Sequence, residues 1–311
     1  MQRKVNQIGP STLMVSLPSK WVKKYNVKKG DSLEVEEKDD QLAIYSQMRC
    51  SKGSKVILNI NNLNTSVIWY YLITAYRSGA DEIELHFIKK TVQDDTAQRE
   101  IEIASFLQMI VGGFIGMEIV RNTPIYAFMK EISTIKQEEY GVIFRRIFYS
   151  VLVTFDDILQ SVANQDKTTL MHIFNNADIQ INKFVDYCIR IHSKSSARPS
   201  AEYAVILHLE EIGDSLKHLA RLLTVKSSDD KVKEIITALK KLFSTLEKFY
   251  FTGDRESLIH FEAQKRTIRE MLRSFPKQND LGVLMVLTNI LNQSLSIMYS
   301  KLLITHQQES Q

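Results

Sequence analysis

Two acidic side chains spaced for one face of a helix are the clearest candidates for chemistry in this sequence. Glu210 and Asp214 lie four residues apart in the segment Leu209-Glu-Glu-Ile-Gly-Asp214, so a helix places their carboxylates on one face, about 6 Å apart. Two like charges this close repel unless a cation or a basic side chain lies between them. Facing helices of a bundle hold hard or first-row metals through such oxygens. The pair is a candidate metal site, and a solvated acidic face with a packing glycine at Gly213 is the alternative.

The segment before this motif carries the same spacing. Asp178 and Asn182 are four residues apart, and Asp186 follows one turn later. If this segment forms a helix that packs against the one carrying Glu210, its oxygens complete a cage around a cation. The predicted metal ligands are therefore Asp178, Asn182, Glu210 and Asp214.

A second group of residues is suited to binding an anion. Residues 1–30 contain seven basic side chains and no acid, whereas residues 31–40 carry six acids against Lys38 alone. This separation gives one small region a positive face. Basic side chains on such a face bind the phosphates of DNA with an affinity that falls as salt rises; a solvated charged surface is the alternative. The predicted DNA contacts are Arg3, Lys4, Lys20, Lys23 and Lys24.

The patterns of the common enzyme classes do not stand out. We find no Ser/His/Asp or Cys/His set, and Gly112-Gly-Phe-Ile-Gly116 lacks the Lys-Ser/Thr of a phosphate loop. Cys50 and Cys188 suggest neither a disulfide framework nor a metal pair. The chain starts Met-Gln-Arg-Lys, unlike a signal peptide, and has no uninterrupted apolar run of about 18 residues. We expect a cytoplasmic protein that is not an enzyme and does not insert into a membrane.

The elements that must position these residues change in character along the chain. A length of 311 residues predicts about two domains, or three if one is small. Seven of the eleven glycines and three of the five prolines lie before residue 140, which predicts strands and turns first and long helices later. The sequence thus indicates a multidomain α+β fold with parts at residues 1–46, 54–135 and 143–305.

Residues 1–46 have the pattern of a small β unit. Leu13, Val15 and Leu17 alternate along a strand that Pro18 ends, a short helix follows over residues 20–25, and Asp39-Asp40 marks a hairpin turn. So small a unit has little bulk to bury and needs a second chain to complete its core. We expect a homodimer or a higher even-numbered oligomer.

Residues 54–135 have an α/β pattern, and we assign them no role. Strands are expected where apolar residues alternate, and helices where their spacing is helical. The expected strands are 55–60, 81–88, 117–120 and 125–129, and the expected helices are 66–76 and 96–109.

From about residue 143 the pattern is helical nearly to the end of the sequence. The expected helices are 143–163, 167–192, 201–226, 230–251, 255–274 and 279–305. Their short connections favour antiparallel neighbours in a bundle. Gln165-Asp166 and Gly253-Asp254 occupy similar places, which indicates two three-helix repeats, about 143–226 and 230–305. Chance similarity among amphipathic helices is the alternative.

The first 46 residues resemble a SpoVT-AbrB domain. The segments that carry the resemblance are Arg3-Lys-Val5, Gly9, Leu13–Pro18, Lys23-Lys24, Lys29-Gly-Asp31 and Leu33-Glu-Val35. The resemblance implies a homodimeric swapped-hairpin β barrel that binds DNA through basic side chains on one face. It places Lys23 and Lys24 on the basic pair of the family's short helix. Pro10-Ser11 departs from the family, in which many members carry an arginine after the glycine.

Residues from about 145 to 305 resemble a PhoU domain, an all-α bundle of two three-helix repeats that regulates phosphate uptake. The likeness lies in the segment 209–214, in Asn164-Gln-Asp166 and in the pair Asp178 and Asn182. It implies a divalent or iron-type metal ion on the acidic motifs. Together the two parts resemble an archaeal type of phosphate uptake regulator.

Three functional hypotheses follow from the residues and these resemblances. The leading one is a DNA-binding transcriptional regulator of phosphate uptake, whose bundle senses phosphate status through a metal or a partner. The main alternative is an adaptor that inhibits a phosphate transporter or a signalling protein such as a kinase, while the first domain only dimerises. An antitoxin with a helical toxin-binding half is the third, which the long patterned helices disfavour because antitoxin tails tend to be short and disordered until bound.

Overall fold

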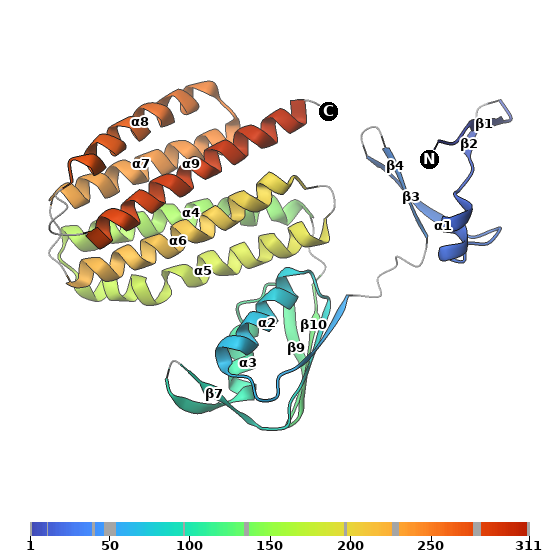
Figure 1. The fold of residues 1–311 in the computed structure, drawn as a ribbon, viewed down its shortest axis with the longest axis horizontal. Coiled ribbons are helices and arrows are strands. Elements are labelled where there is room, and N and C mark those ends of the chain that lie inside the picture. Colours follow the sequence, from blue (N-terminus) through green and yellow to red (C-terminus); the bar gives the residue numbers. More distant parts are fainter. Residues whose placement is uncertain are drawn as a thin grey trace. The chain divides into compact units, whose positions relative to one another are not determined.

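A computed structural model of the chain divides into two compact units, Met1–Ser54 and Lys55–Gln311. The first unit is small and rich in β structure, and the second ends in an all-helical part (Figure 1). The expected α+β class is confirmed in this coarse form, whereas the barrel and the three-helix repeats stay predictions. The structure describes residues 2–10, 12–38, 41–46, 54–95, 97–133, 137–195, 198–225, 230–275 and 281–309.

The described residues of the first unit form two hairpins and a short helix. Its elements are β1 (Val5–Ile8), β2 (Thr12–Val15), α1 (Ser19–Lys24), β3 (Leu33–Lys38) and β4 (Gln41–Ser46). β1 pairs antiparallel with β2, and β3 pairs antiparallel with β4. Gly9 lies in the β1–β2 turn with a φ of 72°, a conformation that glycine adopts without strain.

The first unit has little core of its own. None of the six residues of α1, all of them described, is buried. The apolar side chains of the first hairpin are between 48% and 69% exposed: Val5, Ile8, Leu13, Met14 and Val15. An isolated two-stranded hairpin is marginally stable in water, so these side chains favour the expected second chain.

The second unit begins with an α/β part. Its elements are β5 (Lys55–Asn59), α2 (Thr65–Arg77), β6 (Glu82–His86), β7 (Thr91–Asp94), β8 (Arg99–Glu102), α3 (Ile103–Val111), β9 (Met117–Thr123) and β10 (Tyr126–Glu131). Four strands form a sheet in the order β5-β6-β10-β9, in which only the β5–β6 pair is parallel. α2 and α3 cover one face of the sheet (Figure 1). Alternate strand residues, such as Ile83 and Leu85, point into the core beneath these helices.

One expected element of this part is wrong. The sequence predicts a helix over 96–109, but α3 begins only at Ile103, and a β7–β8 hairpin precedes it. Val92 pairs with Ile101 across the hairpin and is 5% exposed. Gln98 supplies the turn with a φ of 52°. The cross-strand pair thus overrides the helical spacing, and Thr96 lies outside the described residues.

Six long helices form the rest of the second unit, near the expected bounds (Figure 1). They are α4 (Gln137–Ala163), α5 (Lys167–Lys194), α6 (Ser200–Val225), α7 (Asp230–Thr252), α8 (Arg255–Arg273) and α9 (Leu281–Glu309). Their apolar faces meet in one core.

The turns before α5 and α8 share one geometry. Gln165 and Gly253 have φ values of 53° and 68°, and the aspartate after each caps the next helix. Asp166 accepts a hydrogen bond from the Thr169 N–H at 3.0 Å, and Asp254 accepts one from the Ser257 N–H at 2.7 Å. These matching caps support the expected likeness of the two halves, although the complete repeat stays a prediction.

α9 is the one helix of the described residues that is long and apolar enough to cross a membrane by length and composition. In the structure 44% of its apolar window, Leu281–Gln307, is buried. It packs against α6 and α7, as the core helix of a bundle does. Length and composition alone are weak indications of a membrane span.

Candidate DNA-binding face and acidic helix face

All five predicted DNA contacts are exposed in the first unit. Arg3 and Lys4 precede β1, and Lys20, Lys23 and Lys24 lie on α1. α1 starts at Ser19, with Pro18 at the N-cap, and its last turn carries two lysines, Lys23 and Lys24. Basic side chains there interact favourably with the negative, C-terminal end of the helix dipole. Exposed basic side chains of this kind can contact the phosphates of an anionic partner.

Trp21 packs locally. Its ring is half-buried and lies 5.3 Å from the ring of Tyr25, while the Lys24 ammonium lies 5.3 Å from the same Tyr25 ring. The turn that follows is held by Asp31, whose carboxylate accepts a hydrogen bond from the Lys28 N–H at 2.7 Å. These contacts hold the end of α1 and the turn that follows it.

The four predicted metal ligands lie on two helices that pack together. Asp178 and Asn182 are on α5, and Glu210 and Asp214 are on α6. Gly213 lets these helices approach closely, because a Cβ at this position would lie 3.0 Å from the Cδ1 of Ile181. Close packing of α5 on α6 is therefore sufficient to explain why residue 213 is a glycine.

Two cationic side chains already contact these acids. Arg77, from α2, donates from Nη2 to Glu210 at 2.7 Å and from Nε to Asp186 at 2.7 Å. Lys217 of α6 pairs with the buried Asp178 of α5. A metal ion at these carboxylates would have to displace both cations.

The remaining predicted ligands are Asp214 and Asn182. Burial, together with the charges of Asp178 and Glu210, raises the pKa of Asp214. The Asn182 Oδ1 atom is buried and finds no hydrogen-bond partner among the described residues. Within the same residues, no group of three or more His, Cys, Asp and Glu side chains is placed to hold a metal. The metal site stays a prediction.

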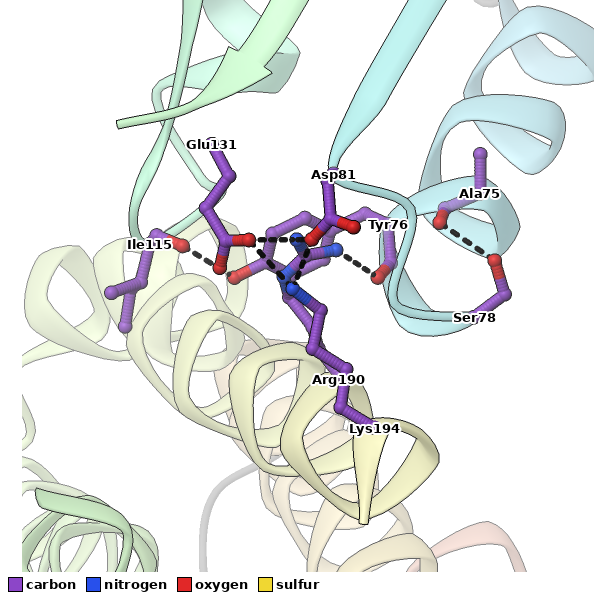
Figure 2. Close-up of polar contacts among 8 residues, drawn as sticks. All are labelled: Ala75, Tyr76, Ser78, Asp81, Ile115, Glu131, Arg190 and Lys194. Atoms are coloured by element: carbon purple, nitrogen blue, oxygen red, sulfur yellow. Dashed lines mark hydrogen bonds and ion pairs between the residues drawn. The ribbon is translucent and has the colours of Figure 1, made fainter. Parts of the chain in front are cut away.

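A second charged contact, which the sequence analysis does not predict, joins α5 to the α/β part. Figure 2 shows Arg190 and Lys194 reaching from α5 toward Asp81 and Glu131. Arg190 donates to the Tyr76 carbonyl at 2.9 Å and lies 3.3 Å from Glu131, and Lys194 lies 2.5 Å from Asp81 and 2.6 Å from Glu131. One signal was available: Arg190 interrupts the apolar run at the end of α5.

Comparison with known families covers the first unit. Residues 7–49 match the MazE family model, described as antidote-toxin recognition MazE, a bacterial antitoxin. The first unit is thus a MazE/AbrB-like domain. No curated protein and no solved structure matches the chain. The expected SpoVT-AbrB likeness is confirmed at this level, and the likeness of the bundle to PhoU stays a prediction.

Proposed function

We propose that this protein is a dimeric, DNA-binding transcriptional regulator of phosphate uptake. The observation that carries the proposal is the exposed basic group of a MazE/AbrB-like unit: Arg3, Lys4, Lys20, Lys23 and Lys24. The first 30 residues contain seven basic side chains and no acid. Such a group attracts the phosphate backbone of DNA and releases counterions when it binds.

Dimerisation follows from the same unit. A second copy covers the exposed apolar side chains of β1 and β2, and burial of that surface stabilises both chains. A twofold dimer presents two copies of α1, so its DNA site has dyad symmetry. The lysines of α1 then contact phosphates in both half-sites.

The bundle supplies the regulatory half of the proposal. Its assignment to phosphate uptake rests on the resemblance of the 209–214 segment to the PhoU signature. In this proposal the bundle responds to phosphate status through a metal ion or a protein partner and alters the DNA affinity of the first unit. The measurement is DNA affinity with and without added phosphate and divalent metal at fixed ionic strength; unchanged affinity would remove this part of the proposal.

A charge-neutralised variant tests the DNA contacts. Changing Lys20, Lys23 and Lys24 together to Gln should abolish specific binding at physiological salt and reduce the salt slope by roughly 0.9 for each DNA phosphate that is no longer neutralised. The matched control changes three exposed lysines of α7, Lys233, Lys241 and Lys248, to Gln. It alters net charge equally and should keep both affinity and slope. If DNA affinity and salt slope fell equally in the two variants, net charge alone would explain the binding. If they fell in neither variant, the adaptor would be favoured.

An antitoxin is the second candidate, which the description of the matched family favours. The bundle would then bind a toxin through a folded helical surface. Co-expression with a toxin encoded beside the gene tests this: growth rescue by the full chain and by its lysine-neutralised variant alike would support neutralisation independent of DNA. Failure to rescue growth would leave the regulator.

A further inference from the structure

Two arginines hold the α/β part of the second unit against the bundle, and they differ in burial. The Arg190 side chain is 1% exposed, whereas that of Arg77 is 24% exposed. They point in opposite directions across the junction. Arg190 reaches from α5 to the α/β part, and Arg77 reaches from α2 to Asp186 on α5 and Glu210 on α6.

We propose that the ion pairs of Arg77 with Asp186 and Glu210 form a releasable clasp between the α/β part and the bundle, with Arg190 as the fixed pivot. The clasp ties α2 to the helix that carries the acidic motif. It is a conformational device that stands apart from DNA binding.

Arg190 is the fixed pivot because its charged side chain is buried and cannot be solvated without separating α5 from the α/β part. Arg190 donates to the Tyr76 carbonyl at 2.9 Å, and its guanidinium lies 4.9 Å from the Tyr76 ring centroid. Glu131 lies 3.3 Å away and Asp81 3.9 Å away (Figure 2). Removing one partner from a buried ion pair leaves an uncompensated charge, which is strongly destabilising. The Tyr76 hydroxyl also donates to the Ile115 carbonyl at 2.8 Å. This bond holds the last turn of α2, whose Tyr76 carbonyl Arg190 contacts.

The clasp is releasable because water reaches it. The Glu210 side chain is 23% exposed, similar to that of Arg77, so solvent and salt screen their attraction. Asp186 is buried at 10% exposure and needs a cation beside it when ionised. The ion pairs therefore hold α2 against the bundle, and any other cation drawn to Asp186 and Glu210 must displace Arg77.

Charge reversal tests the clasp in the full-length chain. Arg77→Glu places three acids together, and amide hydrogen exchange in α2 and in the facing part of α5 should accelerate about tenfold or more. Adding Glu210→Arg restores a pair of opposite charges and should restore protection. The matched control, Lys240→Gln, removes the ion pair with Asp156 between the bundle helices α7 and α4 and should leave exchange in α2 unchanged.

The outcomes separate a clasp from a folding contact. Faster exchange confined to the α2–α5 junction, with recovery in the double variant, supports the proposal. Unchanged exchange in α2 would show that the junction holds without the Arg77 ion pairs and would overturn the proposal. Faster exchange throughout the bundle without recovery would make Arg77 a contact needed for folding. If charge reversal prevents folding, the milder Arg77→Gln variant, which only removes the ion pairs, should still accelerate exchange in α2, and none of these readouts depends on DNA.

Discussion

Gly213→Ala tests whether α5 and α6 pack as closely as the structure shows. Alanine gains about 1 kcal/mol over glycine in a helix interior. At Gly213 the added Cβ would lie 3.0 Å from Cδ1 and 3.2 Å from Cγ2 of Ile181, which is 0% exposed and packed in the core. Overpacking of this kind costs about 1–3 kcal/mol. We expect net destabilisation of about 1 kcal/mol, the difference between these two effects.

The same substitution at Gly141 is the control. This glycine lies on the exposed side of α4, and a Cβ there would meet no atom within 4 Å. Gly141→Ala should therefore stabilise the chain by up to about 1 kcal/mol. The assay is urea unfolding followed by far-UV circular dichroism, with the slope m compared among variants to check that the unfolded state is unchanged.

A second substitution locates the clash. Ile181→Val removes Cδ1, so Gly213→Ala should cost less in that background than in the natural chain. A double-mutant cycle with a coupling energy of about 0.5 kcal/mol or more would assign the cost to this pair. The reasoning would be refuted if Gly213→Ala stabilised the chain as much as Gly141→Ala does.

Two further predictions concern buried groups. Burial outweighs the pairing with Arg77 and raises the pKa of Asp186 to about 6, so the native chain keeps a proton that the unfolded chain releases from about pH 4. This carboxyl should lower the free energy of unfolding by about 3 kcal/mol as the pH rises from about 4 to 6. Urea titrations should show a smaller decline for Asp186→Asn, and an equal decline would contradict the prediction. Burial also raises the pKa of the Cys188 thiol, so in a Cys50→Ser chain this thiol should react with an aromatic disulfide reagent only on unfolding; rapid reaction of the folded chain would show that it is accessible.

The helices of the bundle could be predicted because their signals are local. Apolar spacing marks each core face, and the aspartates at 166 and 254 mark where two helices begin. The expected range 167–192 compares with Lys167–Lys194 in the structure. The β7–β8 hairpin could not be predicted in this way. Its decisive contact, Val92 with Ile101, joins residues whose local pattern also suits a helix.

The acidic motif shows where sequence reasoning about a site stops. The spacing of Glu210 and Asp214 predicts a cation or basic group between these two acids, whereas the basic group found, Arg77, lies between Glu210 and Asp186. Its source could not be found, because Arg77 lies 133 residues away at the end of another helix. An arginine in the last turn of a helix has a sufficient local explanation in the helix dipole. Only the packing of α2 on the bundle brings the two together.

Selection of genomic DNA by the purified full-length chain tests the central claim most directly. The selection is made at about 0.15 M salt, where exposed charges more than about 8 Å apart are largely screened. We expect enrichment of a dyad-symmetric motif upstream of phosphate transport genes, and its absence with the variant in which Lys20, Lys23 and Lys24 are changed to Gln. Recovery of random fragments only, or of the same fragments by that variant, would contradict the account.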